Sequence, residues 1–428
     1  AERDPDGTYE KAKNNFQGKF EDTMGKQDLR LTRDSFSVRD GKLVVQPVTV
    51  DGKTDSRWDE VVVPLHKAAS MRRNELPKAI EWLIRSPQTA KLIYRMLQDK
   101  RAGRDVILVG EQETGKSTIG DAISELLAGP EGIQLKVNYD TTKEEMTYTQ
   151  TLGEGGQAFQ SRFLKGPVPT AMNRGVPLLV EESNQLRAGA AATLNNVSDW
   201  RYLLDPAGNP EEVDPGFWMI HLINPPEEGF DVQEFSDEFL ERHAIYFVPP
   251  LEPEISSLFI AEAATREGLR VHPKLMGQPK LMDDGTPVML DQHGNEVTAG
   301  GVKARWTGFL GLEQTIRQKR KEDSQILPRS PGMGTFKDLM RDIRDYFDAM
   351  LEERNSHLPG IVSGNPGDEH VDVGGVMMDG ADIAYALFNS QFKGQRVMYD
   401  EEEKDLWEVL LDVMIKPQQV LRDMFLQT

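Results

Sequence analysis

Short apolar runs alternate with polar stretches along the first 250 residues of the chain. Two alternating runs within residues 36–45 flank an Asp-Gly pair, which predicts a β-hairpin, and the three valines at 61–63 predict another strand. Between residues 74 and 100 the apolar positions recur every three or four residues, which predicts helices. We therefore expect a small β-containing module over residues 1–72.

The segment from 104 to 250 has the pattern of an α/β domain. Five apolar runs predict buried strands at 106–109, 135–137, 176–180, 218–223 and 244–248. A helical stripe of apolar residues, from Ile119 to Leu127, follows the first run. Strands that alternate with helices favour a parallel sheet covered on both faces. Residues 73–250 are therefore predicted to form an α/β core.

Beyond residue 250 the pattern becomes mainly helical. The clearest helical periodicity covers residues 254–268, 334–356 and 400–427. Turn residues over 276–301 predict an inserted hairpin, and the Gly- and Pro-rich segment 359–375 predicts a loop. The sequence therefore predicts a helical lid over residues 251–428 that contains one hairpin insertion.

Composition narrows the class of protein. The chain has 428 residues, of which 38% are apolar. No apolar run approaches the length of about 18 residues that indicates a membrane span. There is no cysteine, and residues 1–4 show no apolar secretory segment, so we expect a cytoplasmic protein without disulfides. The net charge of −20 argues against a nucleic-acid partner, because phosphate binding needs clustered Lys and Arg.

One motif points to specific chemistry. Residues 110–117 read Gly-Glu-Gln-Glu-Thr-Gly-Lys-Ser, a phosphate-binding pattern that lies here between a predicted strand and a predicted helix. Backbone N–H groups of such a loop wrap a phosphate, Lys116 brings a charge to the β- and γ-phosphates, and Ser117 offers a hydroxyl to Mg²⁺. The sequence therefore predicts that ATP and Mg²⁺ bind at Gly110, Glu111, Gln112, Glu113, Thr114, Gly115, Lys116, Ser117 and Thr118.

A predicted strand that ends in two acids follows the motif. Leu178, Leu179 and Val180 precede Glu181 and Glu182. An enzyme with this type of loop needs one carboxylate near the metal and another that orients the attacking water. We assign the metal role to Glu181 and the catalytic role to Glu182, although an acidic pair alone is equally typical of a solvated turn.

The next core strand ends at Asn224, which is placed to reach the γ-phosphate or the attacking water. Together these stretches resemble the MoxR-like branch of the AAA+ ATPases, well over 104–250 and loosely over the rest. In that family residues 110–117 match the Walker A loop, 178–182 match the Walker B strand and Asn224 matches sensor 1. The resemblance also implies a helix-2 insert near 145–164.

The same resemblance assigns roles to two arginines. A family stretch of the type acid-x-Phe/Leu-Leu-x-Arg matches residues 237–243, which makes Arg242 the candidate finger that acts on a neighbouring subunit's ATP. The sensor-2 Arg normally begins a lid helix, and Arg329 is the best match. The residues after it depart from the usual spacing, so Arg341 and Arg344 stay open as candidates.

One departure from the family bears on activity. The family has Asp where this chain has Glu181, which is one methylene longer, while Mg²⁺ demands tight octahedral geometry. Either the carboxylate adapts through water, or hydrolysis is slow. Glu111 and Glu113 also place negative charge inside the anion-binding loop.

Three functions stay open on this evidence. The resemblance implies an ATP-hydrolysing homo-oligomer, expected as a hexameric ring, that remodels or assembles a protein client as a MoxR-like chaperone. The acids at 111, 113 and 181 favour a nucleotide-ordered assembly module with little hydrolysis. A nucleic-acid-linked AAA+ motor is the third, although the net charge counts against it and the basic cluster at 317–321 is typical of a solvated helix face.

Overall fold

The computed structural model describes most of the chain up to residue 266 and shorter segments beyond it. The described residues are 29–111, 114–152, 161–224, 242–266, 269–271, 279–282, 284–291, 296–297, 300–301, 303–306, 310–311, 314, 341, 370–373 and 376–379. They divide into two compact units, with residues 1–111 and 115–250 in the first and residues 112–114 and 251–428 in the second. Apart from Arg341, the helices predicted at 334–356 and 400–427 lie outside the described residues.

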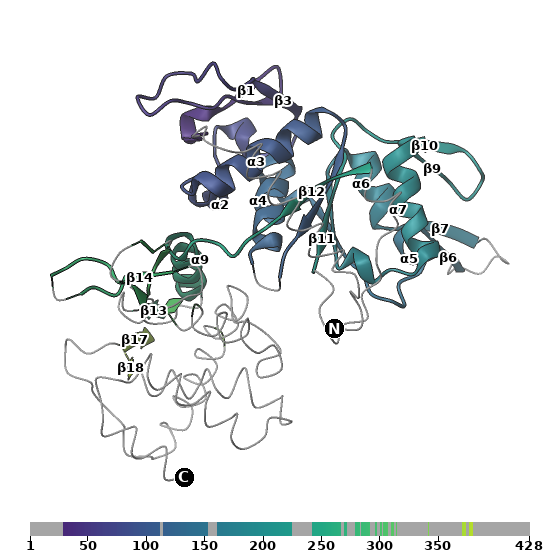
Figure 1. Ribbon diagram of the computed structural model, residues 1–428. Coiled ribbons are helices and arrows are strands. Elements are labelled where there is room, and N and C mark those ends of the chain that lie inside the picture. The colour runs from purple at the N-terminus through teal and green to yellow at the C-terminus, as the bar shows by residue number, and fades with distance from the viewer. Residues whose placement is uncertain are drawn as a thin grey trace, which may run out of the picture. The chain divides into compact units, whose positions relative to one another are not determined.

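The first unit is built on a parallel five-stranded sheet in the order β12-β4-β11-β8-β5, of which Figure 1 labels β12 and β11. Its strands are β4 (Asp105–Val109), β5 (Ile133–Lys136), β8 (Pro177–Glu181), β11 (Trp218–Ile223) and β12 (His243–Phe247). Each coincides with a predicted strand, so the parallel α/β core is confirmed. The loops that follow β4, β8 and β11 leave the sheet on the same side, called here the carboxyl edge, and the strands begin at the amino edge.

Helices cover both faces of this sheet (Figure 1). The helices that the structure describes in the first unit are α2 (Lys78–Leu83), α3 (Pro87–Arg101), α4 (Lys116–Ala128), α5 (Lys143–Met146), α6 (Pro167–Arg174) and α7 (Ala188–Trp200). On one face α4 packs so closely that a Cβ at Gly120 would lie 3.0 Å from Leu179 Cδ2. Glycine therefore permits the approach of this helix to the sheet.

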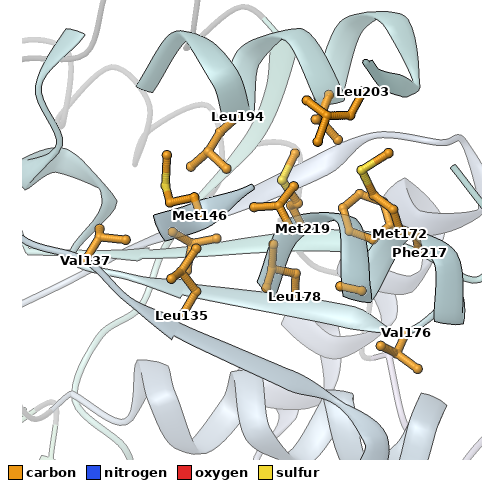
Figure 2. Close-up of a cluster of buried hydrophobic side chains, with 14 of the residues drawn as sticks. Leu135, Val137, Met146, Met172, Val176, Leu178, Leu194, Leu203, Phe217 and Met219 are labelled. Atoms are coloured by element: carbon orange, nitrogen blue, oxygen red, sulfur yellow. The ribbon is translucent and has the colours of Figure 1, made fainter. Parts of the chain in front are cut away.

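The opposite face of the sheet carries a continuous apolar cluster (Figure 2). Leu178 and Met219 on the strands pack with Met172 on α6 and with Leu194 and Val197 on α7, and all five side chains are buried. Removal of this apolar surface from water fixes the body of α7 on the sheet. Both ends of α7 consequently have a defined position relative to the strands.

The N-terminal module is an antiparallel sheet of β1 (Phe36–Arg39), β2 (Lys42–Val45) and β3 (Val61–Pro64). The turn between β1 and β2 lies at residues 40–41, which confirms the predicted hairpin. The Tyr94 hydroxyl on α3 donates to the Asp59 carbonyl at 2.7 Å, and the Trp58 ring packs edge-on against Tyr94. These contacts join the module to α3, and the module lies in the same compact unit as the parallel sheet.

Two hairpins extend the first unit. One consists of β6 (Tyr148–Leu152) and β7 (Ser161–Lys165), and it lies where the insert at 145–164 is predicted. The other consists of β9 (Tyr202–Leu204) and β10 (Pro210–Glu212), and the sequence did not predict it. Short 3-10 helices occupy Arg33–Ser35, Ser70–Arg73, Gly129–Glu131 and Ser183–Gln185, the last being η4.

The second unit contains α9 (Pro253–Arg266), which confirms the helix predicted at 254–268. Its strands within the described residues are β13 (Leu269–Val271), β14 (Met289–Leu290), β15 (Glu296–Val297), β16 (Lys303–Ala304), β17 (His370–Val373) and β18 (Val376–Asp379). Strands β14 and β15 lie inside the predicted insertion at 276–301, and β16 follows it. The prediction of a loop at 359–375 is wrong for residues 370–373. These residues, His-Val-Asp-Val, form β17 and pair with β18 despite the Gly- and Pro-rich surroundings. None of the described helices meets the length and hydropathy that a membrane span requires.

Lys100 joins the end of α3 to the segment that enters β11. Its buried ammonium donates to the carbonyls of Pro215, Gly216 and Phe217 at 3.0, 3.0 and 2.6 Å. Burial lowers the pKa of Lys100 to about 7, and the negative charge of Asp105 opposes this shift. The lysine therefore supplies a donor to three carbonyls of this segment, and the Phe217 carbonyl also accepts from Arg201 Nη2 at 3.4 Å.

Replacement of Lys100 by methionine is expected to lower the free energy of unfolding by about 2 kcal/mol, because buried acceptors lose their donor. The folded-state pKa lies below the unfolded value of 10.5. The unfolded chain therefore binds more protons between about pH 7 and pH 10, and this group adds stability as the pH rises through that window. Urea unfolding at several pH values should show the deficit of Lys100→Met widening from pH 7 to pH 10. The exposed Lys78→Met is the control, and a deficit that does not change with pH would contradict the shifted pKa.

Candidate nucleotide-binding site

The predicted phosphate loop leaves β4 at the carboxyl edge. The Gly110 N–H donates to the Ile223 carbonyl at 3.3 Å, which directs the start of the loop toward β11. Gly115, directly before α4, has a φ of 94°, a left-handed conformation that favours glycine. Ser117 is exposed in the first turn of α4, and Thr118 follows it there. The described residues therefore place a strand before the motif and a helix that begins at Lys116, which is the strand and helix context that the motif requires.

Lys116 is the first residue of α4. Its side chain is buried, and its ammonium donates to the carbonyls of Gly110 and Glu111 at 2.7 and 2.6 Å and to Asn224 Oδ1 at 2.9 Å. A buried ammonium requires such acceptors, because desolvation of an unpaired charge is costly. The structure therefore brings together two residues that the sequence predicted for this site, Lys116 and Asn224.

Asn184 joins the ends of β8 and β11. It lies in η4, directly after the two acids, and its Nδ2 donates to the backbone carbonyl of Asn224 at 2.9 Å. The side chain of Asn224 faces Lys116 while its main chain is held by Asn184. Asn184 was not predicted for this site, since its one signal in the sequence is its place two residues after the acidic pair.

Glu182 adopts a backbone conformation that is uncommon for a residue other than glycine. Its φ is 60°, in the left-handed region, and its N–H donates to the Leu222 carbonyl at 2.8 Å. Its carboxylate accepts from Gln185 Nε2 at 3.1 Å and lies 3.9 Å from the exposed Lys136 ammonium. The turn after β8 therefore holds this acid at the carboxyl edge in a strained conformation, as is frequent at functional sites.

Glu181 ends β8 between Leu222 of β11 and Lys136 of β5. Its half-buried position raises the pKa of its carboxyl group, the nearby Lys136 lowers it, and the charges of Asp121 and Glu182 raise it further. A divalent cation is the counter-charge that favours the ionised form in such surroundings. An acid of this kind at the same edge as the exposed Ser117 hydroxyl fits a Mg²⁺ site of the phosphate-loop type.

Arg242 lies at the amino edge of the sheet, opposite the carboxyl edge from which the phosphate loop leaves β4. It directly precedes β12, whose first residue is paired with Asp105 at the start of β4. Its guanidinium Nε forms an ion pair with Asp199 Oδ1 at 2.5 Å. The five residues of β4 span roughly 16 Å between this level and the loop. The structure therefore does not bring Arg242 to the phosphate loop of its own chain.

The other predicted site residues are placed only in part. Thr114 is described and precedes Gly115 in the loop, whereas Gln112, Glu113, Arg329 and Arg344 lie outside the described residues, as does the basic cluster at 317–321. Arg341 is described and belongs to the second unit. The roles of all these residues stay predictions.

Residues 105–243 match the family model of the AAA domain, dynein-related subfamily. The matched segment begins with β4 and ends at the first residue of β12, so it contains the phosphate loop, both acids, Asn224 and Arg242. The chain therefore carries an AAA+ P-loop ATPase domain, the class of domain that binds and hydrolyses ATP.

The chain is also similar to individual proteins. It is 25% identical over 169 residues to an uncharacterized protein of Staphylococcus aureus (strain USA300), covering 39% of this chain and 63% of that protein. It is 26% identical over 170 residues to the uncharacterized protein YojN of Bacillus subtilis (strain 168), covering 39% of this chain and 54% of that protein. The matched part thus spans about half to two thirds of these curated relatives. Among solved structures, a "putative ATPase" from Cytophaga hutchinsonii matches 45% of this chain and 56% of that chain at 15% identity, with a TM-score of 0.35.

Proposed function

We propose that this chain is the ATP-hydrolysing subunit of a homo-oligomeric ring that remodels or assembles a protein partner, as MoxR-like AAA+ proteins do. The observation that carries the proposal is the convergence of Lys116, Asn224 and Glu182 at the carboxyl edge of the sheet. A buried ammonium at a helix N-terminus binds phosphate, and an adjacent carboxylate activates water. Together these groups suit the hydrolysis of a nucleoside triphosphate.

Each residue has a distinct role in this proposal. The loop N–H groups and Lys116 hold the phosphates, while Ser117 and Glu181 hold Mg²⁺, which neutralises phosphate charge when bound. Glu182 orients the attacking water and accepts its proton. Asn224 positions the water or the γ-phosphate from β11, and its contact with Lys116 supports this role.

Arg242 supports the oligomeric part of the proposal. Because it lies at the amino edge, it serves the site of another subunit rather than its own. The γ-phosphate would then be contacted from both sides of a subunit interface, as expected for a ring. The client surfaces that we propose are the N-terminal module, the β6–β7 hairpin, which exposes Phe163 and Leu164, and the β14–β16 insertion.

A second candidate function is a nucleotide-ordered assembly module with little hydrolysis. The observation that favours it is Glu181, a longer acid than the family's Asp, in a half-buried position that disfavours its charged form. In this case ATP binding would order the ring without rapid turnover. Phosphate release by the assembled protein separates the two functions, since a module of this kind would bind ATP and oligomerise with almost no release.

Replacement of Glu182 by glutamine is expected to retain ATP binding and to lower turnover by about 100-fold, because the amide cannot accept the proton of the attacking water. Phosphate release by the assembled protein and ATP affinity by calorimetry are the two measurements. Glu125→Gln, an exposed position on α4, is the matched control. If the wild type hydrolyses ATP and Glu182→Gln matches its rate, the catalytic role of Glu182 is rejected, whereas a wild type that binds ATP with almost no phosphate release would favour the assembly module.

A further inference from the structure

Ser198 and Asp199, near the end of α7, lie against His243, the first residue of β12, and Arg242, the residue before it. Ser198 Oγ lies 3.3 Å from His243 Nε2, and Asp199 Oδ1 lies 2.5 Å from Arg242 Nε. The two contacts join the same pair of elements side by side at the amino edge. The contact between Ser198 and His243 therefore helps to hold Asp199 beside Arg242, in addition to the ion pair that Asp199 itself forms.

Asp105 anchors this arrangement to the sheet. Its side chain is buried at the start of β4, and its Oδ2 accepts from the Ser198 hydroxyl at 2.8 Å. The same oxygen lies 3.4 Å from Arg201 Nη1, and Oδ1 accepts from the Met219 N–H at 2.9 Å. One carboxylate thus ties the last turn of α7 to both β4 and β11. A satisfied buried network of this type makes its surroundings rigid.

The body of α7 adds to this rigidity. Leu194 and Val197, five and two residues before Asp199, are buried in the apolar cluster (Figure 2 labels Leu194). Asp199 consequently projects from a helix that is fixed by packing on one side and by Asp105 at its end. Asp199 and Arg242 themselves remain partly exposed, at 22% and 29% of their side-chain surface.

We propose that Asp199 is a positioning residue, which fixes the Arg242 guanidinium in the orientation that enters the nucleotide site of the neighbouring subunit. This inference rests on the proposed trans-acting role of Arg242. A long arginine side chain loses rotamer freedom when it docks, and a carboxylate that orients it beforehand reduces that loss. Asp199 acts through Arg242 and contacts no nucleotide itself.

If the Asp199–Arg242 ion pair has only a structural role, a different experimental result is expected. Partly exposed ion pairs contribute little to stability, so loss of the pair should leave folding almost unchanged. If Asp199 positions Arg242, its loss should instead lower turnover while ATP affinity and assembly stay the same. The rate and the stability therefore separate the two roles.

The test compares Asp199→Ala and Asp199→Asn with the wild-type ring. We expect Asp199→Ala to lower turnover at least about tenfold, and Asp199→Asn, which keeps a hydrogen-bonding oxygen, to lower it less. Asp140→Ala is the matched control, because Asp140 is an exposed acid in an ion pair with Arg187 at 3.2 Å. It should leave turnover unchanged. If the alanine variant does not assemble, the asparagine variant gives the same comparison.

Mixed rings identify the subunit on which Asp199 acts. Asp199→Ala mixed with Glu182→Gln should regain activity, because some interfaces then pair an intact Asp199–Arg242 with an intact Glu182. Asp199→Ala mixed with Arg242→Ala should regain none, because each interface retains one defect on the same side. Rescue by Arg242→Ala but not by Glu182→Gln would show that Asp199 acts in its own site, and this would overturn the inference.

The outcomes also separate this inference from the proposed function. Normal turnover in Asp199→Ala together with an inactive Arg242→Ala overturns the positioning role and leaves the ring ATPase intact. Normal turnover in Arg242→Ala itself overturns the trans-acting role, and the positioning role with it. A loss of turnover in Asp199→Ala accompanied by weaker ATP binding would also contradict positioning, since the nucleotide contacts lie at the opposite edge.

Discussion

Replacement of Arg242 by alanine is expected to lower ATP turnover of the assembled protein by about 1000-fold, the effect of an arginine that stabilises charge on the transferring phosphoryl group. ATP affinity should stay near that of the wild type, because Arg242 lies at the amino edge and the phosphate loop at the carboxyl edge. Phosphate release and calorimetry measure the two quantities. Arg174→Ala, which removes a surface arginine paired with Glu131, is the control and should have no effect.

Two further measurements test whether Arg242 acts on the neighbouring subunit. Turnover per subunit should rise with protein concentration as subunits associate. Arg242→Ala mixed with Glu182→Gln should recover part of the activity, because some interfaces then combine both intact residues. An absence of recovery in rings shown to contain both variants would mean that Arg242 serves its own chain or only pairs with Asp199.

Replacement of Lys116 by alanine is expected to weaken ATP binding by about 1000-fold, the equivalent of two charge-assisted hydrogen bonds to the β- and γ-phosphates. The lysine is buried and donates to three oxygens, and we expect its ammonium to reach the β- and γ-phosphates of bound ATP. Calorimetric titration with ATP and Mg²⁺ gives the affinity. Unchanged affinity would reject this site.

A control separates binding from stability in that experiment. Lys116→Ala also leaves the carbonyls of Gly110 and Glu111 and the oxygen of Asn224 without this donor, which costs about 1–3 kcal/mol. Thermal unfolding should therefore be measured beside the titration. Lys53→Ala, at an exposed lysine of the N-terminal module, should change neither quantity.

The strands that precede the candidate site residues could be predicted from the sequence, because each strand shows as a short apolar run. Buried parallel strands are uniformly apolar, so the runs before Gly110, Glu181 and Asn224 were visible as strands. Parallel strands bring their carboxyl ends to one edge, which is why residues distant along the chain meet there. The contact between Lys116 and Asn224 confirms that these two lie together.

The amino edge was not predictable in the same way. Asp105 appears in the sequence as a polar residue before a strand, and Ser198, which donates to it, lies 93 positions away. Nothing in the periodicity of either segment indicates this contact, because it depends on which strands become neighbours. The β9–β10 hairpin was missed since strands of three residues are too short to show a period.

The placement of the phosphate loop and Arg242 at opposite edges of one sheet gives each subunit a polarity. Subunits that complete one another's sites associate head to tail, through two different surfaces. In an open row of such subunits, the first always has a nucleotide site without an arginine and the last an arginine without a site. Closure of the row removes both defects at once. In the proposed assembly, an open row therefore has one complete site fewer than it has subunits, whereas a closed ring has as many complete sites as subunits, so the specific activity of a preparation would report the fraction of sites that a neighbour completes.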